Sequence, residues 1–186
     1  MFLKNNRNED GVISLEACIF LPIFILIVLF VYGFFIMFLG EEVVAHSMLQ
    51  AAESLSLDSY ANEKIGYDDV ETGGDLVTLL YGSLMGYNDE NFSSHQKWYN
   101  GSDKELMTKC VHDRFIGFFG GTAGGANELA DFLNIENGAE GFDFSETTVD
   151  GEELTVKVKY RQSFMYNFNG LAAFNVEKSV KVHMWK

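Results

Sequence analysis

Residues 17–39 read ACIFLPIFILIVLFVYGFFIMFL, a run of 23 residues without one charged side chain. At about 1.5 Å per residue a helix of this run is roughly 35 Å long, enough to cross the ~30 Å apolar core of a bilayer. Only Pro22 and Gly33 fall outside the hydrophobic set, and both residue types are tolerated in membrane helices. This apolar run predicts one membrane-spanning helix over residues 12–40.

A cleaved secretory signal is the main alternative to a membrane span. The apolar core of such a signal is about 7–15 residues long and lies near the N-terminus, whereas this run is longer and begins well inside the chain. Lys4 and Arg7 precede the run, and Glu41 and Glu42 follow it. The positive-inside rule then places the N-terminus in the cytoplasm and residues 41–186 outside.

The part of the chain beyond the run has the composition of an acidic soluble domain. The whole chain carries 13 Lys+Arg and 27 Asp+Glu, a net charge of −14, and residues 41–186 hold 11 and 24 of these. An acidic surface repels phosphate groups, so we expect no nucleic-acid partner. The two cysteines, Cys18 in the run and Cys110 beyond it, cannot form a disulfide framework.

The helix is expected to continue past the membrane. Apolar residues recur there at helical spacing, on one stripe: Val44, Met48, Ala51, Ala52 and Leu55. Together with the run this stripe predicts one helix of about 40 residues, whose outer part, residues 41–57, is amphipathic. A soluble domain can pack on that outer part.

Two further helices are predicted in the middle of the chain. Ser102 and Glu105 form a capping-box pattern that opens a helix ending near Phe119. The glycine-rich stretch 120–125 reads as a flexible connector, and residues 126–133 form a second short helix. Residues 75–81 are compatible with either a helix or a strand.

The C-terminal part predicts three antiparallel strands. Apolar residues alternate in 142–144, in 153–161 and again in 176–184. Asp150-Gly151 is a hairpin signal between the first two, and a turn is expected near Asn169-Gly170. A sheet with one apolar face needs a helix to cover it, and the outer part of the N-terminal helix is the natural candidate. The predicted fold class is α+β, with the acidic domain 41–186 packed on the helix continuation.

No pattern of residues predicts catalysis or metal binding. The histidines are scattered and lack metal-ligand spacing: His46, His95, His112 and His183. The acidic cluster 68–75 lacks the ligand order of a calcium loop, and the stretch 120–125 lacks the Lys-Ser/Thr of a phosphate loop. Packing or surface histidines, a solvated loop and a connector are the preferred interpretations, and we expect no enzyme activity, no metal and no cofactor.

One carboxylate touches the apolar run. Glu16 lies at the cytoplasmic membrane edge, where an unpaired carboxylate is costly and a partner is expected. Its position suits the dipole of a helix start, which is the plain structural interpretation. The spacing adds a second interpretation, because Gly11 precedes Glu16 by five residues and follows a short leader containing Lys4 and Arg7.

This arrangement resembles the class III signal of type IV pilin-like proteins. In that family a prepilin peptidase cuts after the glycine, and the fifth residue of the mature chain is a glutamate. Carried over, residues 1–11 are the leader, the cut lies between Gly11 and Val12, and Glu16 takes the fifth mature position. The resemblance implies that the new ammonium group of Val12 pairs with Glu16 of a neighbouring subunit and sets the register between subunits.

A second resemblance narrows the family. The stretch Gly11-Val-Ile-Ser-Leu-Glu-Ala-Cys-Ile-Phe-Leu-Pro22 is similar to the start of TadE-like pseudopilins of tight-adherence (Tad/Flp) pilus systems, in which Leu-Pro follows the glutamate at this distance. An aromatic residue is usual directly after the glutamate, and here Ala17 stands there. The resemblance covers residues 1–60, and beyond them it rests on the pilin-like architecture alone.

The resemblance implies a minor pseudopilin of the bacterial cell envelope that takes part in pilus assembly. Its implied partners are the prepilin peptidase, other pilin or pseudopilin subunits, the assembly platform and the lipid bilayer. Two alternatives remain. One is an unprocessed single-pass binding module with an acidic outer domain, and the other is an enzyme tethered by the same anchor.

Overall fold

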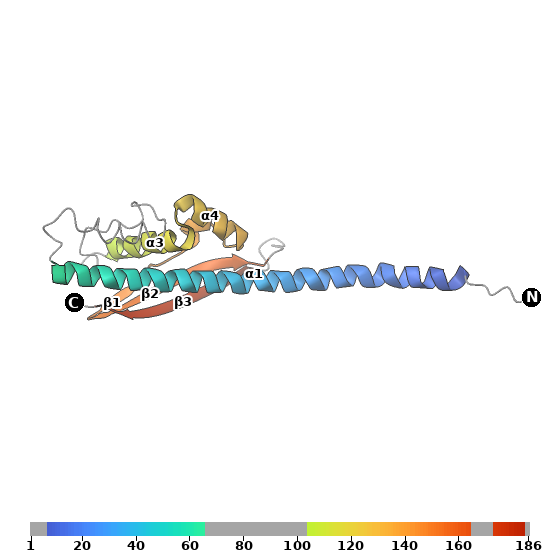
Figure 1. Ribbon diagram of the computed structural model, residues 1–186, viewed down its shortest axis with the longest axis horizontal. Helices are drawn as coiled ribbons and strands as arrows, with labels where there is room; N and C mark the ends of the chain where they lie inside the picture. The colour runs from blue at the N-terminus through green and yellow to red at the C-terminus, as the bar shows by residue number, and fades with distance from the viewer. Residues whose placement is uncertain (1–6, 66–103, 165–172, 185–186) are drawn as a thin grey trace, which may run out of the picture.

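The chain folds as a long helix with an α+β domain packed on its outer half, as predicted from the sequence (Figure 1). The computed structural model describes residues 7–65, 104–164 and 173–184, with side chains from residue 16 onward except those of 58 and 61–65. The elements in chain order are α1 (Arg7–Ile65), α3 (Lys104–Gly120), α4 (Ala123–Phe132), the 3₁₀ turn η4 (Gly138–Gly141), β1 (Thr148–Asp150), β2 (Glu153–Ser163) and β3 (Ala173–His183).

Helix α1 has 59 residues and is longer at both ends than the predicted 40. Glu9 and Asp10 lie in its first turn, where acidic side chains suit the positive end of the helix dipole. Between Gly40 and Gly66 the sequence contains neither glycine nor proline, so nothing interrupts the helix before Ile65. Figure 1 shows it as one continuous ribbon, through Pro22 as well.

The predicted stripe on α1 forms the centre of the core. Its members are at most 1% exposed: Val44, Met48, Ala51, Ala52 and Leu55. Helix α3 packs on one side of α1 and the sheet on the other, so that α1 lies between two layers (Figure 1). Aromatic side chains from α3 and from the segment before β1 fill the space beside it: Phe115, Phe119, Phe142 and Phe144.

The sheet has three antiparallel strands in the order β1-β2-β3. The predicted face of β2 is buried: Leu154, Val156, Val158 and Tyr160 are at most 4% exposed. The Asp150-Gly151 hairpin is confirmed, with Asp150 paired to Glu153 and Gly151 at a positive φ of 59°.

The first strand was predicted in the wrong place. The strand is β1, whereas residues 142–144 make a single bridge, between Asp143 and Lys159. The chain turns directly afterwards, because Asp143 Oδ1 accepts a hydrogen bond from Ser145 N at 2.8 Å. The alternation of Phe142 and Phe144 therefore buries two rings on α3 without building a strand.

The glycine-rich stretch 120–125 is not a flexible connector, because it forms a tight contact between the end of α3 and the beginning of α4. Helix α4 begins at Ala123, three residues before the predicted start, and Thr122 Oγ1 caps it by accepting from Gly125 N at 3.1 Å. A Cβ on Gly120 or on Gly125 would overlap backbone atoms of the other helix. The glycines allow the two helices to approach each other at the turn.

Some predictions lie outside the described residues. They are the element at 75–81, the acidic cluster 68–75, His95, the cap at Ser102 and the turn near Asn169-Gly170.

Candidate functional site: the apolar helix and its junction with the outer domain

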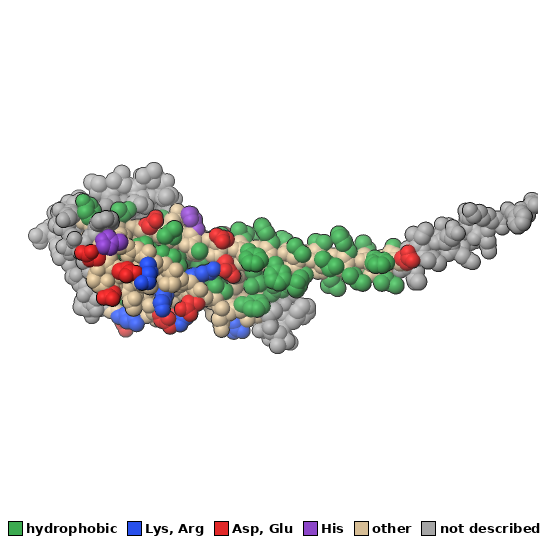
Figure 2. Space-filling model, turned by 90° about the horizontal axis from the view of Figure 1, so that it is seen from below, with side chains coloured by type: hydrophobic (Ala, Val, Ile, Leu, Met, Phe, Trp, Pro, Cys, Tyr) green, Lys and Arg blue, Asp and Glu red, His purple; other side chains and the backbone are tan. Residues whose placement is uncertain are grey.

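The first half of α1 is exposed and apolar. From Glu16 to Leu57 it contains an 18-residue window of mean hydropathy 2.9, of which 11% is buried, so this helix is long and apolar enough to cross a membrane. It is the only such helix among the described residues. Figure 2 shows hydrophobic side chains around this half and charged side chains gathered on the outer domain. Phe20 and Phe38, near the two ends of the run, are 67% and 65% exposed.

The residues of the predicted processing site lie at the beginning of α1. Gly11 and Val12 are within its first two turns, and Glu16 is exposed one turn later, before the apolar run. Pro22 lies inside the helix and has no N–H, so the carbonyl of Cys18 receives no helical hydrogen bond from it. The outer domain packs on the other end of α1, away from the beginning of the helix where Glu16 lies.

Contact between the outer domain and α1 begins inside the apolar run. The ring of Phe164, just after β2, fills a notch over Gly33, where a Cβ would overlap it. The same ring lies 5.5 Å from the ring centroids of Phe30 and Phe34. Gly33 therefore leaves room for this close helix–domain contact, whereas the expectation from the sequence was only that a membrane helix tolerates this residue.

One turn further on, a buried amide fastens β2 to two helices. Gln162 is 0% exposed, and its Nε2 donates to Leu133 O at 2.9 Å and lies 3.5 Å from Ile36 O. Gly40 provides the space, because a Cβ there would overlap that nitrogen. Gln162 Oε1 has no hydrogen-bond partner among the described residues.

An ion pair closes the junction at the end of the run. Lys178 Nζ on β3 donates to Glu41 Oε2 at 2.6 Å, with both side chains about one third exposed. Tyr160 is buried beside this pair, and burial together with the charge of Glu41 raises the pKa of its phenol. We call the set of contacts from Gly33 to Glu41 the junction; its partners from the sheet are Phe164, Gln162, Tyr160 and Lys178.

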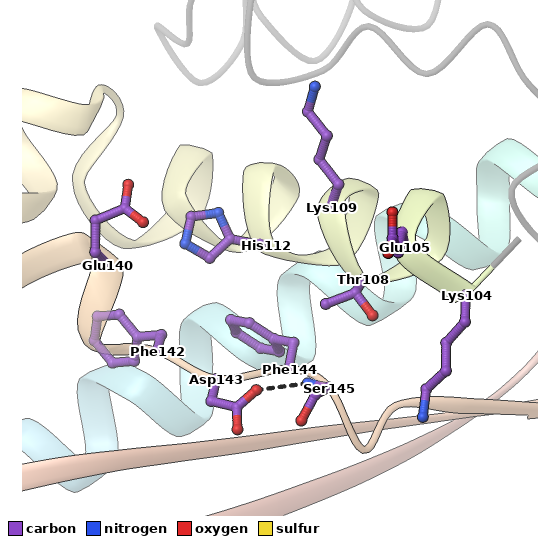
Figure 3. Close-up of a pocket in the computed structure, with 10 residues that line it drawn as sticks. All are labelled: Lys104, Glu105, Thr108, Lys109, His112, Glu140, Phe142, Asp143, Phe144 and Ser145. Carbon is purple, nitrogen blue, oxygen red and sulfur yellow. Dashed lines mark hydrogen bonds between the residues drawn. The ribbon is translucent and has the colours of Figure 1, made fainter.

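A second candidate site is an open cavity of about 700 Å³ between α3 and the segment 140–145 (Figure 3). Phe142 and Phe144 form its apolar wall, and charged groups of both signs surround it: Lys104, Glu105, Lys109, Glu140 and Asp143. Lys109 points away from the cavity. The hydrogen bond from Ser145 N lowers the pKa of the Asp143 carboxyl.

The histidine in this cavity holds two elements together. His112 Nε2 lies 3.2 Å from Ala139 O in η4, and Nδ1 lies 3.5 Å from Asp113 Oδ1. The hydrogen bond with Asp113 raises the pKa of His112, while partial burial opposes the rise. Because both ring nitrogens face acceptors within the chain, the ring links α3 to η4 and presents neither nitrogen to the cavity as a base.

Comparison of the chain with protein-family models, with curated proteins and with solved structures found no match. The candidate site therefore rests on the geometry of this chain. Gly11, Val12, Glu16 and Pro22 stay predictions from the sequence, and the junction was not among the predicted sites. Gly33 and Gly40, spaced seven apart on one side of the helix, were the available signal for a close contact there.

Proposed function

We propose that this protein is a minor TadE-like pseudopilin that takes part in assembling a Tad/Flp-type pilus, after a prepilin peptidase cuts between Gly11 and Val12. The observation that carries the proposal is the spacing of Gly11 and Glu16 directly before the apolar run. This spacing occurs at the start of the one described helix that is apolar enough for a membrane.

The architecture supports the proposal because it separates two tasks along a single helix. The exposed apolar half of α1 offers a surface to lipid or to other apolar helices, and the outer half is covered by the folded domain. A pilus subunit needs both, a helix that moves from the bilayer into a fibre and a domain that stays folded during the move.

Glu16 has a defined part in this proposal. Cleavage creates an ammonium group at Val12, and in an apolar helical core that group pairs with Glu16 of a neighbouring subunit. A buried pair adds little net stability, but leaving one partner alone costs about 3–5 kcal/mol, so the pair selects one register. The exposure of Glu16 leaves its carboxylate accessible to such a partner.

The proposal includes a location and an orientation. The apolar run crosses the cytoplasmic membrane once, the leader faces the cytoplasm, and the outer domain lies on the other side. The partners are the prepilin peptidase, other pilin or pseudopilin subunits and the assembly platform.

The N-terminal sequence of the protein from native membranes tests the proposal. We expect a chain that starts at Val12, and a Gly11→Val variant that starts at Met1, because the peptidase needs the small residue before the cut. The predicted bond lies in the first two turns of α1, where helix ends fray and a peptidase can reach the backbone. A wild-type chain that starts at Met1 in cells with an active prepilin peptidase contradicts the proposal and favours an unprocessed, membrane-anchored binding module.

A further inference from the structure

The depth of the junction in the bilayer follows from the helix length, once the membrane span of the proposed function is accepted. If the hydrocarbon core begins at Ala17, after the charged Glu16, its ~30 Å correspond to about 20 residues and end near Ile36. Gly33, which Phe164 covers, then lies about 5 Å inside the hydrocarbon. Tilting the helix moves the boundary further along the chain and places this contact deeper.

The contacts of the junction become more polar from the expected hydrocarbon core toward the headgroups. Its sheet side chains run from the Phe164 ring at Gly33, through the Gln162 amide between Ile36 and Gly40, to Lys178 on Glu41. These contacts span about 12 Å along the helix axis. On each side a bilayer changes from hydrocarbon to hydrated headgroups over about 5–8 Å, a layer that lies within this 12 Å and in which amides and charges are tolerated and aromatic rings gather.

Large apolar side chains around the junction remain exposed to the surroundings. Phe30 and Phe38 on α1 are 57% and 65% exposed, and Phe174 at the start of β3, paired with Gln162, is 50% exposed. Phe174 thus places an exposed ring on the sheet beside Gln162, which lies close to Ile36 of the run. Large exposed apolar patches of this kind mark a membrane or a protein contact.

We infer that the outer domain is partly immersed in the membrane: the end of the sheet that carries Phe164 and Phe174 contacts lipid in the leaflet on the domain side. The occupant of this surface is the bilayer itself. Phe164 packs on the apolar run itself, Phe174 is paired with Gln162 beside that run, and the polarity of the junction follows the bilayer profile. The inference rests on the proposed membrane insertion and adds to it a fixed height of the domain.

Depth-dependent quenching in lipid tests the inference. The full-length chain with Cys18→Ala and Cys110→Ala receives one new cysteine, is labelled with an environment-sensitive fluorophore and is placed in phosphatidylcholine nanodiscs containing lipids brominated near the headgroup. The test variant is Phe174→Cys, at an exposed position that tolerates the label. Phe20→Cys, in the run, is the control inside the bilayer, and Leu57→Cys, 45% exposed at the far end of the outer domain, is the control outside it.

We expect the label at position 174 to be quenched at least half as strongly as the label at position 20, and the label at position 57 to be unaffected. Quenching at position 20 but not at 174 overturns the inference while membrane insertion stands. A blue-shifted but unquenched label at 174 also overturns it, since a protein then covers the surface. Quenching at neither position overturns the insertion on which both proposals rest.

Discussion

His112 on α3 faces Ala139 O in η4 with one ring nitrogen and its neighbour Asp113 with the other, and only the protonated ring can donate to both acceptors at once. The neutral ring turns a lone pair toward one of these two acceptors. The contact should therefore depend on the charge of the ring.

The folded state raises the pKa of His112 above its usual 6.5, chiefly through the hydrogen bond with Asp113. A raised folded pKa means that this contribution to stability is fully present below the unfolded value and is lost as the pH rises through the folded value. Replacing His112 by Phe, which keeps a ring against Phe144, should cost about 1 kcal/mol of unfolding free energy in acid and less above neutral pH. Urea unfolding in detergent micelles at two pH values measures the difference.

Asp113→Asn is the matched control for this prediction. It keeps the His112 contact with Ala139 but removes the carboxylate, so the pKa of His112, followed by NMR titration, should fall toward its usual value. An equal cost of His112→Phe at both pH values would contradict the prediction.

Single residues were predictable only where their role is local. The five buried residues of the α1 stripe followed from spacing along one helix. The roles of Gly33 and Gly40 could not be predicted in this way. Each glycine makes room for a side chain far away in the sequence, Phe164 or Gln162, and no local pattern shows which side chain packs there.

At the scale of elements, the packing of α3 against α4 leaves different amounts of space beside two neighbouring glycines of α4. A Cβ on Gly125 would overlap Gly120 O, whereas a Cβ on Gly124 would meet nothing nearer than Thr122 Oγ1 at 3.9 Å. Gly125→Ala should destabilise the protein by about 1–3 kcal/mol, because the obstructing atom is backbone and cannot rotate away. Gly124→Ala should be neutral or stabilise by up to about 1 kcal/mol, because it lowers the entropy of the unfolded chain.

Thermal unfolding of the full chain in micelles, followed by circular dichroism, tests this pair. The Gly125→Ala protein should melt below the wild type, and the Gly124→Ala protein at or above it. If both variants melt at or above the wild-type temperature, the turn is a loose connector, as the sequence first indicated.

The elements themselves were largely predictable, because helical and strand periodicity are local patterns. The pairing of β2 with β3 followed from two long alternating stretches. The misplaced first strand shows the limit of such patterns. The alternation in 142–144 indicates only that two rings are buried on one side. An irregular segment, held by one bridge and a turn, buries these rings as well as a strand would.

At the scale of the whole molecule, the proposed function depends on a single carboxylate. Glu16→Ala should leave membrane insertion intact, because it makes the start of the helix more apolar, and should reduce incorporation into a pilus about tenfold or more. The reason is that an unpartnered ammonium in a helical core costs about 3–5 kcal/mol, and 1.4 kcal/mol is already tenfold.

Carbonate extraction measures insertion, and immunoblotting of the sheared fibre fraction measures incorporation. Glu42→Ala, at an exposed position on α1 beyond the run, is the matched control and should assemble normally. Normal incorporation of the Glu16→Ala protein would remove the proposed role of this residue.

The overall arrangement was predicted in outline, since a long apolar helix followed by an amphipathic stripe and an alternating sheet leaves few ways to bury both faces. The height at which the domain meets the helix was not predictable. This height is set by three contacts with α1: Phe164 at Gly33, Gln162 at Gly40 and Lys178 at Glu41. Each contact joins residues far apart in the sequence, so no local pattern predicts where along the helix the domain packs.

The unbroken course of α1 has a mechanical consequence. From Gly33 to Ile65 the helix extends about 50 Å with the outer domain fastened along it, so the two move as one rigid lever. With α1 in a bilayer, as proposed above, a change of about 10° in its tilt displaces the far end of the helix sideways by about 8 Å. On the proposed function, a small change in membrane thickness or in the packing of a neighbouring helix would therefore move the distal tip by several ångströms.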